Sequence, residues 1–112
     1  DFVYVDDAVE AFLAAGATDD VNGEAFNVGG DEHLAHRDLV KLLVEIAGSG
    51  RYTFVDWPAE KKVIDIGSFY ADSSLIRART GWAPSVTLRD GFARTFEYYR
   101  RHLLHYVAPG SV

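Results

Sequence analysis

The chain contains no cysteine, which excludes both a disulfide scaffold and thiolate chemistry. It also lacks any apolar run near the ~20 residues that a membrane-spanning helix needs, and it shows no secretory leader. Basic residues are few, because 11 stand against 17 acidic ones and the net charge is −6. Nucleic-acid binding needs a concentrated basic face, so we expect no nucleic-acid partner. Because the sequence has no membrane-spanning run and no leader, we also expect no membrane partner and a cytoplasmic setting.

What the chain does contain is typical of a globular domain. Its 112 residues are 48% hydrophobic and 13% aromatic, a composition that excludes disorder and allows one modest core. Residues 1–5 read as an apolar strand, and a strand that starts at the first residue needs a neighbour to pair with. We therefore predict one domain over residues 1–112 that is a fragment of a longer polypeptide.

The order of apolar periods and turn residues predicts an α/β fold with the topology β-α-β-α-β-loop-α-α. Helices are expected from Asp7, whose carboxylate would form a capping box with Glu10, to Gly16 as the left-handed stop, and then over residues 37–47, 73–80 and 87–106. The expected strands are residues 1–5, 24–28 and 52–55, and the long loop 59–71 could hold a further short strand at 63–66.

The last of these helices carries aromatic residues at helical spacing. Thr87 is its expected cap, with Asp90 three residues later, and Phe92, Phe96 and Tyr99 follow on one face. We expect this stripe to be core. The helix over 37–47 has a weaker start, since only Ala35 or His36 precedes it where Ser or Thr would cap it better.

Four stretches resemble one known family in order and spacing. They are DFVYVDDAVEA at residues 1–11, NGEAFNVGG at 22–30, ADSSLI with TGWAP at 71–84, and TLRDGF at 87–92. Together they resemble the NAD-dependent sugar-nucleotide epimerases and dehydratases of the extended short-chain dehydrogenase/reductase family, over residues 1 to about 99. The resemblance implies a substrate-binding lobe that closes over a nucleotide-diphosphate sugar, while a separate, upstream Rossmann lobe holds NAD or NADP. The reaction could be that of an isomerase, a lyase or an oxidoreductase.

The resemblance also implies a phosphate site. The family clamps the substrate diphosphate with an R-P-G-D sequence ten residues before the A-D aspartate, and counting back from Asp72 places Lys62 at the arginine and Asp65 at the aspartate. Lysine lacks the bidentate fork of arginine, so the contact would be less directional. Lys61 competes for the same role, because a shift of one residue would exchange the two. A solvated lysine pair is the plain alternative.

Two aromatic residues flank the same loop. Trp57 and Tyr70 could stack on the base or the sugar of a nucleotide, and packing within the protein is an equal alternative. Four histidines form two pairs, His33 with His36 and a second pair at residues 102 and 105. With no cysteine and no third ligand indicated, we interpret them as surface residues and predict no metal site.

Catalytic residues of the family are missing from the sequence. No tyrosine is followed by a lysine four residues later, and no glycine-rich cofactor loop follows the first strand; we interpret Gly29 and Gly30 as a turn. The fragment should therefore bind no NAD and catalyse nothing alone. The competing hypothesis is a stand-alone, non-catalytic domain that binds a nucleotide or a protein, and a natural reading frame of roughly 300 residues would decide against it.

Overall fold

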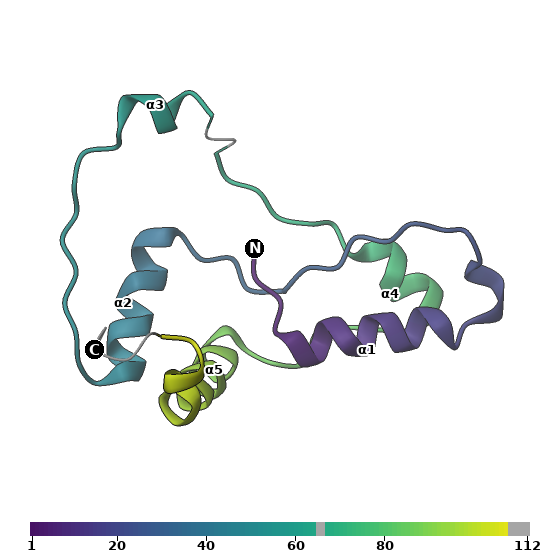
Figure 1. Ribbon diagram of the computed structural model, residues 1–112. Helices are drawn as coiled ribbons and strands as arrows, with labels where there is room; N and C mark the ends of the chain where they lie inside the picture. The colour runs from purple at the N-terminus through teal and green to yellow at the C-terminus, as the bar shows by residue number, and fades with distance from the viewer. Residues whose placement is uncertain (65–66, 108–112) are drawn as a thin grey trace.

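The computed structural model describes residues 1–64 and 67–107, and these residues are helical, turn or extended, with no β-strand in either range. The helices are α1 (Val5–Gly16), the 3₁₀ turn η1 (Asp19–Val21), α2 (His36–Ala47), α3 (Ala59–Lys62), α4 (Ser74–Thr80), α5 (Leu88–His102) and the 3₁₀ turn η2 (Leu103–His105). Figure 1 shows α1 beside α4 at one end, α2 beside α5 at the other, and α3 at the far point of a long connection.

The predicted β-α-β-α-β topology is therefore not seen. The two helices expected after it do occur, as α4 and α5, and α5 ends at His102, where the 3₁₀ turn η2 follows. The three expected strands, residues 1–5, 24–28 and 52–55, have no ladder in the structure. Residues 1–2, 29–30 and 71 do approach one another, but the link is made by the carboxylate of Asp1, which accepts from the backbone N–H groups of Gly30 at 3.0 Å and Ala71 at 2.5 Å. A side chain thus holds segments that a strand would join through its backbone. The extra strand considered at 63–66 falls partly outside the described residues.

The capping box expected at the first helix is wrong. α1 begins at Val5, so Asp7 already lies within the first turn, and Tyr4 is the N-cap without a side-chain hydrogen bond. Gly16 is the last helical residue and does not adopt a positive φ. The carboxylate of Asp7 is used elsewhere in the fold, which explains why the local pattern misled.

Other helix ends agree with their sequence signals. Gly48 follows α2 and Gly81 follows α4, both in the left-handed region at φ 64° and 75°, where glycine carries no Cβ penalty. Thr87 caps α5 by accepting from the backbone N–H of Asp90 at 3.1 Å. Ala35 precedes α2 and offers no side-chain cap, as its sequence indicated. The loop 59–71 differs from expectation because it opens with the short helix α3.

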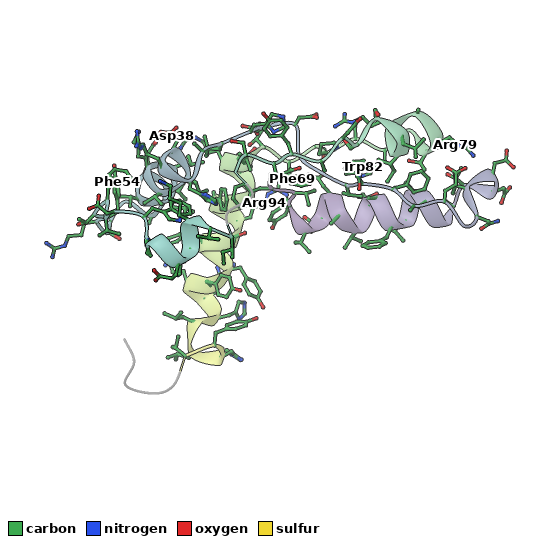
Figure 2. The ribbon with its side chains drawn as sticks, turned by 90° about the horizontal axis from the view of Figure 1, so that it is seen from above. Asp38, Phe54, Phe69, Arg79, Trp82 and Arg94 are labelled. Atoms are coloured by element: carbon green, nitrogen blue, oxygen red, sulfur yellow. The ribbon has the colours of Figure 1, made fainter. Side chains whose placement is uncertain are left out.

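The core is small and lies at one end of the molecule. The buried hydrophobic residues are Ala11, Val21, Ile76 and Trp82. Ala11 of α1 packs against Ile76 of α4 and against Trp82, and Phe26 and Val28 cover this group from the returning chain. Figure 2 shows Trp82 against α1. The small residues Ala11 and Ala14 on the inner face of α1 let α4 and the indole approach closely. This core therefore joins the first helix to residues 76–82.

Asp7 fastens this core. Its side chain, 3% exposed, accepts from the backbone N–H and the hydroxyl of Ser85, each at 2.9 Å, and from the N–H of Val86 at 3.0 Å. The indole N–H of Trp82 donates to the backbone carbonyl of Asp7 at 3.0 Å. Burial by itself raises the pKa of Asp7, but these hydrogen bonds and the nearby Arg94 outweigh it and leave the pKa below its usual value.

The other end of the molecule is open. No residue of α2 is buried, and Gly91 is the single buried residue of α5. The radius of gyration is 17.6 Å, compared with ~13 Å for a compact domain of this length. The aromatic stripe of α5 is accordingly not a core within this chain, since Phe96 is 41% and Tyr99 44% exposed. A stripe of this kind needs a further layer to cover it.

Candidate functional site

A cleft of about 760 Å³ opens between the two ends of the molecule. Five segments form its walls: residues 1–3 ahead of α1, Val28, residues 33–36 at the start of α2, Trp57, and residues 67–71 ahead of α4. In Figure 2, Phe69 lies near the segment that leads into α1. Segments far apart in the sequence therefore meet at one hollow, as binding sites require.

The walls are held together by a close backbone contact. A side chain at Gly30 would place its Cβ 2.2 Å from the carbonyl oxygen of Phe2, and one at Gly29 would lie 2.7 Å from a carboxylate oxygen of Asp1. At position 30 only glycine permits this approach, because the close atom belongs to the backbone. Neither glycine adopts a positive φ. The turn expected at these positions is thus a tight packing contact instead.

Aromatic side chains dominate the lining. Trp57 and Tyr70, which flank the long loop and were considered for stacking on a base or a sugar, both line the cleft and are 55% and 58% exposed. His33 stacks on Tyr70 with ring centroids 4.3 Å apart and planes 29° from parallel. His36 and Phe69 line the cleft as well. These rings offer flat faces on which a base or a sugar ring could lie.

The two lysines predicted to contact phosphate lie elsewhere. Lys61 and Lys62 form the last turn of α3, are exposed, and are absent from the cleft lining. In the sequence they lie between two lining residues, Trp57 and Gly67, but α3 itself contributes no residue to the lining. Asp65, the third predicted phosphate-site residue, lies outside the described residues. The structure brings Trp57 and Tyr70 of the predicted site together in the cleft and leaves Lys61 and Lys62 outside its lining.

The charges around the cleft limit what it can do. None of the described residues that line it is Lys or Arg, and its one carboxylate, Asp1, is engaged by the two backbone donors described above. Such a surface can hold an aromatic or sugar ring, but a diphosphate would need cations from outside the lining. The nearest candidates along the chain are the lysines of α3. Sequence reasoning missed His33, His36 and Phe69, because only the fold brings residues 33–36 next to residues 67–71.

No group of three or more His, Cys, Asp or Glu side chains is placed to hold a metal ion within residues 1–64 and 67–107. No helix in the same ranges combines the length and the apolar character needed to cross a bilayer.

Comparison with known proteins points to one group of enzymes. No family model matches the chain. It is 34% identical over 102 residues to a dTDP-glucose 4,6-dehydratase from Streptomyces griseus, which covers 91% of this chain and 30% of that enzyme. It is 32% identical over 100 residues to a UDP-glucose 4-epimerase from Mycolicibacterium smegmatis, covering 89% of this chain and 31% of that enzyme.

A solved structure agrees with these relatives. The crystal structure of UDP-glucose 4-epimerase with UDP-glucose from Thermotoga maritima superposes with a TM-score of 0.78 at 35% identity, covering 92% of this chain and 32% of that one. The chain belongs to the extended short-chain dehydrogenase/reductase family of sugar-nucleotide epimerases and dehydratases. It spans about 30% of the length of the curated relatives that it matches.

Proposed function

We propose that the chain is the substrate-binding portion of an NAD- or NADP-dependent enzyme that epimerises, dehydrates or reduces a nucleotide-diphosphate sugar, and that it is not catalytic alone. The observation that carries this proposal is the aromatic cleft, which gathers Trp57, Phe69 and Tyr70 from positions flanking the family's phosphate motif. The solved relative with UDP-glucose supports the same class of ligand.

In this proposal the cleft binds the ring portions of the substrate. The stacked pair His33 and Tyr70 presents one flat surface and Trp57 another, so a base or a hexose can gain dispersion and desolvation on entering. Lys62, with Lys61 beside it, and Asp65 serve the diphosphate and its neighbouring hydroxyl groups. The lysines supply the positive charge that the cleft lining lacks.

The nicotinamide cofactor would supply hydride transfer in the complete enzyme, but the residues described here do not fit it. A pyrophosphate cradle needs glycines with free backbone N–H groups at the start of a helix. At Gly29 and Gly30 the space is filled by the carboxylate of Asp1 and the carbonyl of Phe2, which would repel a phosphate. We therefore assign the cofactor to a partner Rossmann lobe. In this proposal the chain contributes to substrate binding and to no step of hydride transfer.

Titration calorimetry tests this division of roles. The 112-residue chain should show no binding to NAD, whereas a dissociation constant in the low micromolar range would contradict the assignment of the cofactor to another lobe. The competing proposal, a stand-alone binding domain of the cytoplasm, predicts tight binding of a nucleotide or a protein by the chain alone.

The phosphate role is best tested in a hybrid enzyme in which this chain replaces the matching part of the Thermotoga maritima epimerase. Lys62→Ala removes a charge-assisted contact, so KM for UDP-glucose should rise about ten- to a hundredfold. Lys62→Arg should restore or tighten binding through its fork. Lys41→Ala is the matched control, because Lys41 is exposed and pairs with Asp38 on α2, away from the cleft lining. A rise with Lys61→Ala alone would shift the register by one, and no rise with either would leave a solvated pair.

A further inference from the structure

The end of α5 carries a cluster of tyrosine rings. Tyr98 and Tyr99 lie near the end of the helix, and Tyr106 directly follows η2. The ring centroids of Tyr98 and Tyr99 are 5.5 Å apart, and that of Tyr106 lies 5.0 Å from Tyr99 and 6.3 Å from Tyr98. The chain has six tyrosines in all, so three of the six meet at one place because η2 turns residue 106 back toward the helix.

This cluster is open to solvent. Tyr98, Tyr99 and Tyr106 are 49%, 44% and 57% exposed, and none of these three described residues belongs to the lining of the cleft. Figure 2 shows the later turns of α5 extending away from the other helices. A reagent in solution can therefore reach all three rings, and the proposed substrate site does not use them.

Two of the phenol groups touch directly. The hydroxyl oxygens of Tyr98 and Tyr106 are 2.9 Å apart and share a hydrogen bond. This bond raises the pKa of Tyr106, so its phenol keeps its proton at neutral pH. The ring carbons ortho to a hydroxyl are bonded to the carbon that carries it. Contact between the two hydroxyls thus also brings ortho carbons of the two rings toward each other, and these are the carbons through which two oxidised phenols couple.

A proton acceptor stands beside the pair. The ring centroids of His102 and Tyr98 are 4.6 Å apart, with planes 37° from parallel. His102 follows Tyr98 by four residues on α5, so the helix keeps the two side chains neighbours. A phenol that loses one electron also loses its proton, and a neutral imidazole has a ring nitrogen free to accept one. The surroundings of Tyr98 therefore favour its one-electron oxidation.

We infer that Tyr98 and Tyr106 form a site of oxidative modification, at which a haem peroxidase with hydrogen peroxide couples the two rings into dityrosine. Each phenol gives up one electron and one proton, and these reduce one hydrogen peroxide to two waters. One carbon–carbon bond forms between the two ortho carbons, and the hydrogen on each of these carbons moves to its own ring's oxygen, which restores both phenols. The new bond fastens residue 106 to α5 across η2.

Treatment of the 112-residue chain with a haem peroxidase and hydrogen peroxide tests this site. The monomer should lose the mass of two hydrogen atoms and gain the fluorescence of dityrosine. Trypsin cleaves after Arg94, Arg100 and Arg101, so the product should join the peptides 95–100 and 102–112. At about 10 µM chain, coupling within one chain should exceed coupling between chains roughly 100-fold, because groups joined by a short segment meet at an effective concentration of ~1 mM.

Single substitutions identify the two rings. Tyr98→Phe and Tyr106→Phe should each abolish the joined peptides, because a phenyl ring has no hydroxyl to oxidise, and circular dichroism should show unchanged helix in both variants. Tyr52→Phe is the matched control: Tyr52 is 41% exposed, and its ring packs on Phe54 with centroids 5.3 Å apart. This variant should give the same yield as the natural chain.

Four results would overturn the inference. They are a chain that gains no dityrosine, products formed mainly between chains, an equal loss of yield in Tyr52→Phe, and joined peptides that persist in Tyr98→Phe but vanish in Tyr99→Phe. His102→Gln should slow the coupling without changing which peptides are joined, and an unchanged rate would remove the imidazole from the site. The proposed function does not enter any of these measurements, so its failure would leave this site standing.

Discussion

The two ends of the molecule differ in how far they are finished. Around α1 and α4, buried side chains meet from both halves of the sequence, and Asp7 and Trp82 tie residues 7–14 to residues 82–86. Around α2 and α5, the amphipathic helices pack against each other, but their hydrophobic side chains are at most partly buried, and Gly91 is the one fully buried residue of the two helices. The comparison teaches that one chain can bury a small core at one end while its helices at the other end keep their hydrophobic side chains only partly buried.

The largest effect is expected at Trp82. Trp82→Ala removes the biggest side chain of the small core and leaves the backbone carbonyl of Asp7 without its donor, so the free energy of unfolding should fall by about 3–5 kcal/mol. Typical domains have only ~5–15 kcal/mol in total. Circular dichroism should therefore report loss of helix at room temperature. Trp82→Phe keeps most of the volume and should cost only about 1–2 kcal/mol; equal losses in both variants would show that packing contributes little.

Asp7 should come next. Asp7→Ala leaves the N–H groups of Ser85 and Val86 unpaired at a largely buried site, which should cost about 2–5 kcal/mol in urea denaturation. Because the folded-state pKa of Asp7 lies below the usual 3.8, its contribution is complete above that pH and is lost as the pH falls through the lower value. Thermal melts between pH 7 and pH 2 should thus show a steeper acid loss for the natural chain than for Asp7→Asn. Parallel curves would contradict the role of the ionised carboxylate.

The open end should respond less. Phe96→Ala, at a side chain already 41% exposed, should cost about 1–2 kcal/mol, less than the ~3–5 kcal/mol of a buried aromatic residue. Measured by urea denaturation, a loss as large as that of Trp82→Ala would show that α5 is as well packed as α1, which would remove the contrast between the two ends.

The smallest effect is expected at Glu97. Its carboxylate accepts from Arg100 and Arg101 on the exposed side of α5, and these hydrogen bonds lower its pKa to about 2. Exposed ion pairs add little, so Glu97→Gln should shift the melting temperature by less than about 2 °C at pH 7. The difference should vanish as the pH falls from 4.5 to about 2. A larger shift would make this face part of a packed layer.

Local signals in the sequence predicted what is locally determined. Helix ends at Gly48, Gly81 and Thr87 were correctly predicted because a left-handed glycine or a capping hydroxyl acts within one turn. The strands were not, because a strand exists only with a hydrogen-bonded neighbour that pattern alone does not supply. Asp7 misled for a related reason: its partners Ser85 and Val86 are more than 70 residues away and outcompete the local cap.

The candidate site was predicted in part for the same reason. Trp57 and Tyr70 stood out because they flank one loop, and the structure places both in the cleft. The stacking of His33 on Tyr70 and the hydrogen bonds of Asp1 with Gly30 and Ala71 become visible only in the folded chain. The roles of Lys61, Lys62 and Asp65 stay predictions, since neither lysine lines the cleft and Asp65 lies outside the described residues.

The contacts of Asp1 and Asp7 have a consequence for how the chain folds. The bond from Asp1 to Ala71 closes 70 residues, and those from Asp7 to Ser85 and Val86 close 78 and 79. Loops of this length must be closed before any compensating contact forms, and dominance of such non-local contacts slows folding. During synthesis, the inner face of α1 lacks its partners Ile76 and Trp82 until most of this chain has been made. Its exposure to chaperones and to other nascent chains should therefore last until residues 71–86 arrive.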